Sequence, residues 1–510
     1  MGTPTRRRTL SQMPFGPFCP SVYDSHGILA PVILDEATIA KAADEGRRRR
    51  AETLNLVILL GTVVAVVLML LSFRRTVDDD LWLHLRIGDE IRDGERFGGA
   101  DPLTVLADRP YVPSQWLAEV IASISYDLTG LAGIHVLRLV AVSLVAVAIY
   151  STSRSLIPPV KAAVVTLPAL FATSAAWAER PQLVGLGLHA LALLIWLRAW
   201  RDGTVPWLIV PITWLWACIH GTWAVGIATG LVMTVAIALD RRHRPRRTRL
   251  LMVTLASMVA VGSTPLGPAL LLEPLSVSTA ARQSVNEWQP PSLTNPLLLV
   301  VVAMGLISIL ALVRRRVLTW ASVALLALGA GLAVYSVRTI AFGAVLMGSA
   351  LAAALFVGKA APGARSHPEN WLWPITTTVI VLGGLIWGSP EPEITDASLR
   401  SHIDRLPAGT KIAVQPDVSG WVLFHQPELR PLRDLRAEVY SATAVDTFEH
   451  IWSADVGWER RLAALDVHVV LVRSADPLAR ALPESALRRV AVGNDYELWV
   501  DATWTGAATV

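Results

Sequence analysis

Long runs of apolar residues, separated by short polar segments, dominate the chain from residue 54 to residue 388. A helix needs about 20 mostly apolar residues to cross the hydrocarbon core of a bilayer, and the runs predict about eleven such helices. We place them at 54–73, 132–152, 159–178, 182–200, 204–219, 222–239, 250–266, 296–313, 317–336, 340–358 and 370–388. The pattern therefore predicts an α-helical polytopic membrane protein.

The segments outside these runs have patterns of their own. Residues 1–53 are polar and precede the first apolar run, which predicts a disordered cytoplasmic tail without a cleavable signal. Loop 74–130 carries two stretches with apolar residues at helical spacing, Leu81–Ile91 and Trp116–Leu128, which is typical of interfacial helices. We assign 54–388 to a transmembrane domain that includes this external loop.

The tail 389–510 reads as a small external α/β domain. Short apolar runs predict strands, and helical periodicity fills the segments between them. The expected strands are Lys411–Val414, His468–Val472 and Tyr496–Val500, and the expected helices are 395–405, 442–452 and 457–465. About 120 residues suffice to bury a core, so the tail is expected to form a domain.

Composition agrees with a membrane protein and excludes a soluble one. Hydrophobic residues make up 53% of the 510 residues and charged residues only 17%, whereas soluble proteins carry about 25% charged residues. The two cysteines, Cys19 and Cys218, are too few for a disulfide framework or a cysteine zinc site.

The distribution of charge orients the predicted spans. If each predicted span crosses the membrane once, in alternating directions, every basic cluster falls on one side of the membrane, which is then the cytoplasmic side. The clusters are Arg47–Arg50, Arg154 with Lys161, Arg198 with Arg201, Arg241–Arg249, Arg314–Arg316, and Lys359 with Arg365. The external segments are acidic: 74–130 holds 11 acidic and 6 basic residues, and 389–510 holds 18 and 12. We predict the N-terminus inside and the C-terminus outside.

Asp78, Asp79 and Asp80 follow directly after the first predicted span. Carboxylates at a membrane boundary repel one another unless they are solvated or paired, so they mark a candidate site. In a helix that begins at Asp80, His84 lies on the same face. Asp80 and His84 could hold a divalent ion, or the acidic residues could cap the helix.

Further polar residues fall at the external ends of the threaded helices. Ionisable groups at membrane depth are costly and are functional candidates, although an arginine near a helix end also snorkels to the interface. These residues are Arg138, Arg180, Gln182, His220, Glu287, Trp288 and Arg338. Carboxylates and several cations on one face predict a pocket for an anionic substrate with a carboxylate base. We expect no nucleic-acid partner, because basic loop 241–249 is typical of a topology determinant.

The motif Asp78–Gly88, DDDLWLHLRIG, resembles the first external loop of bacterial multispanning proteins related to the GT-C glycosyltransferases. The resemblance covers roughly residues 55–500. Further matching segments are Asp101-Pro102, Arg109–Val112, Gln115–Glu119, Arg180–Leu183, Leu215–Ala217, His220-Gly221, Pro265–Gly267, Glu287-Trp288, Arg338 with Phe342, Gly420-Trp421 and Asp434–Tyr440.

This resemblance implies a GT-C-like fold in the bacterial plasma membrane and transfer of a sugar from a polyprenyl-phosphate carrier. The acceptor would be a cell-envelope glycan, lipid or protein on the external face. Asp78 or Asp80 would be the base of an inverting displacement, and Arg180, Arg338 and Arg138 would neutralise the phosphate. Mg²⁺ or Mn²⁺ near Asp80 and His84 could assist.

Two other classes of function remain open at this stage. A non-catalytic scaffold for envelope assembly would bind a lipid-linked glycan in the same pocket. A transporter would place its ionisable groups near the midplane and show repeat symmetry, whereas these gather at one face. Carboxylates in contact with Arg180, His220 and Arg338 around a cavity would favour the transferase, and polar residues scattered over the rim would favour the scaffold.

Overall fold

The structure is a computed structural model that describes residues 40, 43–46, 61, 78–94, 99, 101–240, 246–275, 277, 286–355 and 396–508. The chain divides into two compact units, Met1–Leu56 and Val57–Val510. Residues 40 and 43–46 of the first unit are helical. Several predicted features lie wholly or almost wholly outside the described residues. They are the tail 1–53, the spans 54–73 and 370–388, and the clusters Arg47–Arg50 and Lys359 with Arg365.

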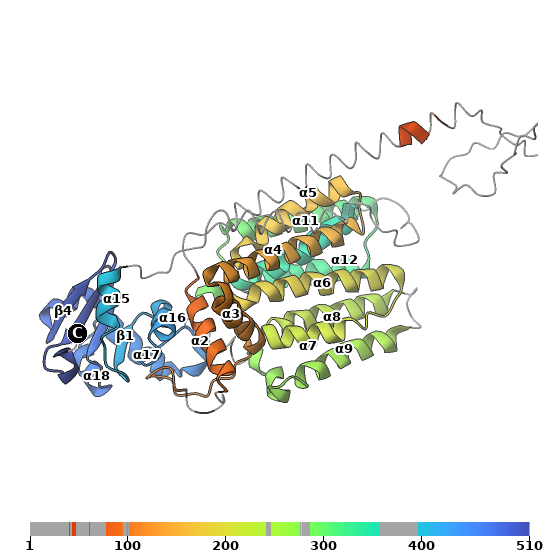
Figure 1. The fold of residues 1–510 in the computed structure, drawn as a ribbon. Coiled ribbons are helices and arrows are strands. Elements are labelled where there is room, and N and C mark those ends of the chain that lie inside the picture. Colours follow the sequence, from red (N-terminus) through yellow and green to blue (C-terminus); the bar gives the residue numbers. More distant parts are fainter. Residues whose placement is uncertain are drawn as a thin grey trace, which may run out of the picture. The chain divides into compact units, whose positions relative to one another are not determined.

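The second unit begins with two helices of the external loop and continues into a bundle of longer helices (Figure 1). The loop helices are α2 (Asp80–Arg92) and α3 (Trp116–Thr129). The bundle contains α4 (Leu131–Arg154), α5 (Pro159–Thr173), α6 (Pro181–Asp202), α7 (Ile209–Ile219), α8 (Trp223–Leu239), α9 (Arg247–Gly262), α11 (Pro296–Arg315), α12 (Trp320–Tyr335) and α13 (Ile340–Leu355). Short 3₁₀ turns lie between them: η2 (Ser174–Ala176), η4 (Gly267–Leu271), η5 (Asn286–Trp288) and η6 (Val337–Thr339).

Four of the described helices are long and apolar enough to cross a membrane: Leu131–Arg154, Pro181–Asp202, Pro296–Arg315 and Val337–Leu355. A fifth span is possible if Arg247–Gly262 and Gly267–Leu275, which meet at 119°, are counted together. The predicted count of about eleven is therefore wrong for the described part of the chain, where four or five spans meet the length and composition criteria.

The short helices explain this difference. Helix α7 has 11 residues and rises only about 17 Å, well short of a bilayer core of about 30 Å. It stops at Ile219 because His220 takes an extended conformation, and α12 stops at Tyr335 because Ser336 does the same. The predicted spans 204–219 and 317–336 end close to these residues, but the helices begin later, at Ile209 and Trp320.

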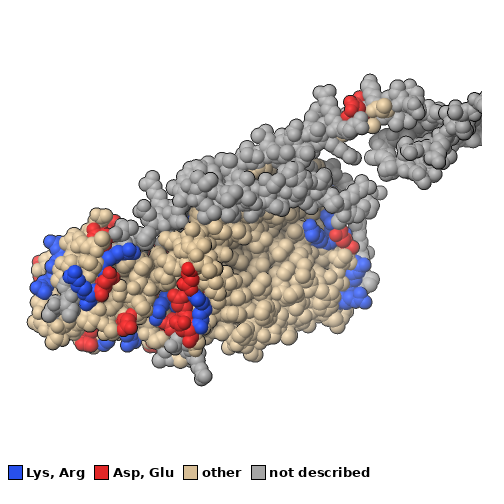
Figure 2. All heavy atoms as spheres, viewed as in Figure 1, with Lys and Arg blue, Asp and Glu red and all other residues tan. Residues whose placement is uncertain are grey.

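Charged side chains are scarce over much of the bundle surface. Figure 2 shows a broad uncharged face, with acidic and basic side chains near α2 and α3 and mostly basic side chains, with a few acidic ones, at the opposite end. At that opposite end, Arg201 Nη1 donates to the Ser155 carbonyl at 2.8 Å and Arg315 Nη1 donates to the Ala354 carbonyl at 3.1 Å. An uncharged band between two charged ends is what a bilayer requires of a protein surface.

The C-terminal segment contains a five-stranded mixed sheet with helices on both faces, as the sequence predicted for an α/β domain. Its strand order is β2 (Arg430–Pro431), β1 (Lys411–Val414), β3 (Val469–Arg473), β5 (Tyr496–Asp501) and β4 (Leu487–Val492). Strand β1 is parallel to β2 and β3, and β5 is antiparallel to β3 and β4.

Successive side chains of a strand point to opposite faces of the sheet, so each strand contributes residues to two separate cores. In β3, Val469 and Leu471 face one core, while Val470 and Val472 face the other. Helices α15 (Ala397–Ile403) and α16 (Pro416–His425) cover the first face. Helices α17 (Ala442–Trp452), α18 (Trp458–Ala464) and α19 (Pro477–Ala481) cover the second. The sequence did not predict α16, β2 or β4.

The loop between α2 and α3 is attached to this domain. Val105 N–H donates to the Pro431 carbonyl and Leu106 N–H to the Leu432 carbonyl, each at 3.0 Å. Beside them, the Arg436 guanidinium makes two bonds to Asp101, at 2.8 and 2.9 Å, and also contacts Asp434. All three of these charged side chains are 5% exposed or less.

Replacing Arg436 with Gln should destabilise the protein by about 3–5 kcal/mol, because two buried carboxylates lose their counter-charge. Thermal unfolding in detergent, followed by near-ultraviolet circular dichroism, measures the loss. The matched control is Arg489→Gln on β4, whose half-exposed side chain pairs with Glu497 at 3.5 Å and should cost less than about 1 kcal/mol. Equal losses for the two variants would contradict a structural role for the buried network.

Candidate functional site

Three carboxylates share the guanidinium of Arg180. Its Nε lies 2.7 Å from Asp78 Oδ1 and 3.0 Å from Asp80 Oδ2, and its Nη1 lies 3.0 Å from Glu287 Oε2. Asp80 begins α2, Arg180 precedes α6 and Glu287 lies in η5, so the contact joins segments that are far apart in the sequence. The predicted site residues Asp78, Asp80, Arg180 and Glu287 therefore meet in one cluster.

Local structure explains how the two aspartates come to face Arg180. The Asp78 carboxylate accepts the Asp80 backbone N–H at 3.2 Å, and the Asp78 carbonyl accepts the Leu81 N–H at 3.0 Å. These bonds form the first turn of α2, where anions are favoured by the helix dipole. Arg180 has an extended backbone and precedes Pro181, whose fixed φ suits the first position of α6.

Arg338 provides a second cation close to Arg180. Its guanidinium lies over the Trp288 ring at 5.4 Å from the centroid, and its carbonyl accepts from Gln182 Nε2 at 3.2 Å. Its Nη2 lies 3.4 Å from His220 Nε2. The predicted residues Gln182, His220 and Trp288 thus all contact Arg338.

His220 lies between Thr222 and Arg338. Its Nδ1 is 3.0 Å from the Thr222 backbone nitrogen, and its Nε2 faces Arg338 Nη2. Burial, and after it the charge of Arg338, lowers the pKa of His220 well below its ordinary value, which keeps the ring neutral. A neutral His220 leaves Arg338 as the cation of this contact.

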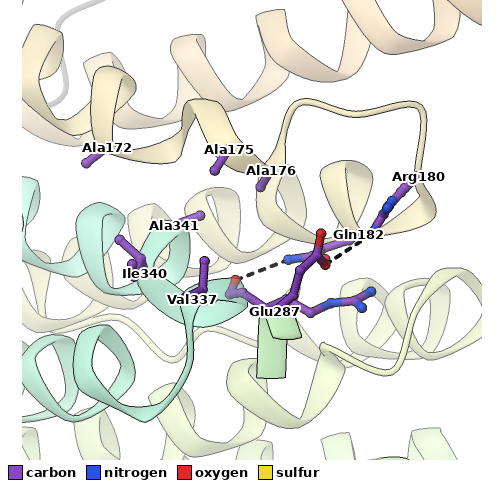
Figure 3. A pocket seen from close by; sticks show the side chains of 10 residues that line it. Ala172, Ala175, Ala176, Arg180, Gln182, Glu287, Val337, Ile340 and Ala341 are labelled. Carbon is purple, nitrogen blue, oxygen red and sulfur yellow. Dashed lines mark hydrogen bonds and ion pairs between the residues drawn. The ribbon is translucent and has the colours of Figure 1, made fainter. Parts of the chain in front are cut away.

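A cavity of about 70 Å³ lies beside these residues. Arg180, Gln182, Glu287 and Arg338 line its polar side, and Figure 3 shows Gln182 and Glu287 pointing toward its centre. The remaining wall is apolar and consists of Ala172, Ala175, Ala176, Val337, Ile340 and Ala341. The cavity therefore combines an ionic rim with a wall of small apolar side chains.

His84 lies on α2 one turn after Asp80, and its side chain contacts Glu119 of α3. His84 Nδ1 is 3.1 Å from Glu119 Oε1, and Glu119 is fully buried. Burial alone would lower the pKa of His84, but the hydrogen bond and charge of Glu119 outweigh it, so the pKa is raised. The sequence did not single out Glu119 as a partner of His84, since the two are 35 residues apart.

The described residues contain no group of three His, Cys, Asp or Glu side chains arranged to hold a metal ion. Asp80 contacts Arg180 and His84 contacts Glu119, so each of the two predicted ligands has another partner in this structure. We therefore route no chemical step through a metal ion. Metal ligation by Asp80 and His84 stays a prediction.

Arg138 lies apart from the cavity and pairs with Glu179 at 2.5 Å inside the bundle. The two side chains are 0% and 2% exposed. Glu179 directly precedes Arg180, so this pair connects α4 to the backbone that carries the shared guanidinium. The sequence placed Arg138 at the site but missed Glu179, although a carboxylate between the third and fourth predicted spans was a signal for it.

The fold resembles that of a solved membrane-associated transferase. The oligosaccharyltransferase of Archaeoglobus fulgidus in its apo form matches 89% of this chain and 75% of its own, at 12% identity and a TM-score of 0.53. The same enzyme with an inhibitory peptide and dolichol-phosphate matches at 13% identity, with 87% and 74% coverage and a TM-score of 0.53. The complex of the same enzyme with Zn and sulfate matches this chain at 15% identity, with a TM-score of 0.50.

Sequence comparisons add no relatives: no protein-family model and no curated protein matches the chain. At such low identities the structural likeness concerns the fold. It shows that the chain shares the fold of this archaeal enzyme.

Replacing Glu179 with Gln should cost about 3–5 kcal/mol of stability, because Arg138 keeps its charge and loses a buried counter-ion. The double variant Arg138→Met/Glu179→Met should recover most of that loss, since apolar side chains of similar size can replace a buried pair. Asp202→Asn is the control: its pair with Arg201 at the other end of α6 is partly exposed. Thermal unfolding in detergent measures the stability of all three variants. A double variant as unstable as Glu179→Gln would contradict this interpretation.

Proposed function

We propose that the protein is a membrane glycosyltransferase of the GT-C type, which transfers a sugar from a polyprenyl-phosphate carrier to an acceptor on the external face. The observation that carries the proposal is the contact of Asp78, Asp80 and Glu287 with Arg180 at the rim of a cavity that Arg338 also lines. A scaffold with polar residues scattered over its rim would not need such a cluster.

In the proposed reaction, Asp78 or Asp80 acts as the general base. The carboxylate takes the proton of the acceptor hydroxyl while the acceptor oxygen bonds to the anomeric carbon of the sugar. The bond between that carbon and the phosphate oxygen breaks, and the phosphate leaves with the electron pair. A single displacement of this kind inverts the anomeric configuration.

Two cations stabilise the departing phosphate in this proposal. Arg338 and Arg180 both line the cavity, and neutral His220 contacts Arg338. Donors held in place before the reaction stabilise developing charge without reorganisation. Gln182 and Trp288 hold Arg338 by a hydrogen bond to its carbonyl and by a cation–π contact. Arg138, predicted to bind the phosphate, acts through Glu179 and the Arg180 backbone.

The apolar wall of the cavity suits the first part of a prenyl chain. The alanine methyl groups on this wall leave room for a branched hydrocarbon next to a phosphate. The structurally similar archaeal enzyme has been solved with dolichol-phosphate and also with a tethered acceptor peptide. Here the acceptor is assigned more broadly to a cell-envelope glycan, lipid or protein.

The proposed location is the plasma membrane of a bacterium, with the N-terminus in the cytoplasm and the C-terminus outside. The basic end of the bundle supports this orientation, because positive charge is enriched on the cytoplasmic side. The site residues precede α6 and α13, at the end remote from Arg201 and Arg315, so they would face outward.

The function is tested by a transfer assay with purified protein and a panel of polyprenyl-phosphate sugars. We expect transfer with at least one donor, and a loss of 100-fold or more, on the order expected for general-base catalysis, in Asp80→Asn. The matched control is Asp79→Asn, which removes the exposed carboxylate next to Asp80 and should retain most activity. Transfer that is undiminished in Asp80→Asn would contradict the role of this residue, and failure with every donor would favour the scaffold.

The same assay tests the predicted divalent ion. If Mg²⁺ or Mn²⁺ assists the reaction, EDTA will lower the transfer rate and either metal will restore it. His84→Gln should then raise the metal concentration that gives half the maximal rate. A rate that EDTA leaves unchanged would contradict the metal prediction without affecting the assignment of Asp80.

A further inference from the structure

Helix α2, which carries Asp80, is packed between two other helices at unusually short distances. A Cβ atom added to Gly88 would stand 2.3 Å from the Glu119 carbonyl oxygen of α3. On the other side, a Cβ atom added to Gly420 of α16 would stand 3.0 Å from the Leu83 backbone nitrogen and 3.4 Å from the Asp79 carbonyl oxygen. Both glycines therefore allow backbones to approach where any side chain would force them apart.

The contact with α16 reaches the turn that holds the carboxylates. Asp79 lies between Asp78 and Asp80, and its carbonyl oxygen is one of the atoms nearest to Gly420. A shift of α16 against α2 would move this turn, and with it both carboxylates that contact Arg180.

Apolar packing joins α2 to the C-terminal domain over its whole length. Leu81, Trp82 and Leu85 share a core with residues of α16 and the sheet. Leu83 and Ile87 belong to a second cluster that includes Leu423, Val439 and Tyr440 of the domain. Although the sequence predicted an interfacial helix here, the apolar side chains of α2 are buried against protein.

The chain that follows α2 is also held by the domain. Arg436 binds Asp101, the Tyr440 hydroxyl donates to Thr104 Oγ1 at 3.0 Å, and Ser441 N–H donates to Asp108 Oδ1 at 2.8 Å. With the backbone bonds of Val105 and Leu106 to the residues after β2, these contacts fix the segment from 101 to 108.

None of the residues that line the cavity belongs to the C-terminal domain, within the part of the chain that the structure describes. The domain therefore acts on this site only through neighbouring segments, which are α2, the loop that follows it, and the parts of α3 and α4 that carry Tyr126 and Ile134; of these, α2 carries Asp80 itself. We infer that the domain positions the two carboxylates: α16, through Gly420, holds the first turn of α2 so that Asp78 and Asp80 face Arg180. This inference rests on the proposed function for its kinetic consequence but not for its structural one.

Gly420→Ala and Gly420→Val test the inference. Displacing reacting groups by up to 1 Å costs on the order of 100-fold in rate. We therefore expect kcat to fall by about threefold to tenfold for alanine and by about 100-fold for valine. KM for the donor should change less than about twofold, because the residues that line the cavity are unaltered. The matched control is Gly331→Ala on α12, where an added Cβ meets nothing within 4 Å.

Hydrogen–deuterium exchange provides a second measurement that does not require activity. In Gly420→Ala, the peptide from residue 79 to residue 92 should exchange faster than in the unmodified protein, while peptides from β1, β3 and β5 keep their protection. Leu423→Val removes one carbon from the same interface and should produce a smaller effect of the same kind, even if Gly420→Val does not fold.

The two measurements separate the possible failures. Unchanged exchange in α2 overturns the inference, whatever happens to kcat, because the domain would then not act through this helix. An equal loss of protection in α2 and in the sheet also overturns it, because that result indicates general destabilisation. If the unmodified protein transfers no sugar, the proposed function fails, and the exchange measurement still decides whether the domain holds α2.

Discussion

A single guanidinium fixes the geometry on which the proposed chemistry depends. Arg180 faces Asp78, Asp80 and Glu287, and removing such groups from water is costly unless their partners stay within reach. Each group lies at or next to the end of an element, so the cluster determines where α2, α6 and η5 meet. Arg338 lines the same cavity as Arg180 and adds a second positive charge there, which favours the binding of an anion.

The sequence predicted local features better than boundaries within the membrane. The expected strand Lys411–Val414 and the expected helix 442–452 coincide with β1 and α17, because β1 is a short, largely buried apolar run and α17 has one apolar face at helical spacing. The count of spans was wrong because several apolar runs form helices of only 10–17 residues, such as Ile209–Ile219 and Trp320–Tyr335, which are short for a bilayer core. Helix α16 has almost no amphipathic asymmetry, since protein covers most of its circumference, and it was missed for that reason.

In the candidate site, too, the sequence identified residues from local signals but not their partners from distant parts of the chain. Charge and position along the chain brought Asp78, Asp80, Arg180, Glu287 and Arg338 together before any geometry was known. The sequence missed Glu119 and Glu179, the partners of His84 and Arg138, because a buried carboxylate is recognisable only from the cation it meets. Periodicity predicts which face of a helix is apolar, but not which neighbour covers it. Thus α2 was expected at a lipid interface and is instead enclosed by protein.

The attachment of the first loop to the last domain has a consequence for biosynthesis. Asp101 and Arg436 are separated by 335 residues, which a ribosome adds in roughly 20 to 70 s at 5–20 residues per second. During that interval the loop with Asp78 and Asp80 has already been made, but the domain that encloses α2 has not. A chain that is cut short before the sheet forms would therefore reach the membrane without the domain contacts that enclose α2. The end of synthesis is thus the point at which this helix, and the turn that precedes it, gains its last neighbours.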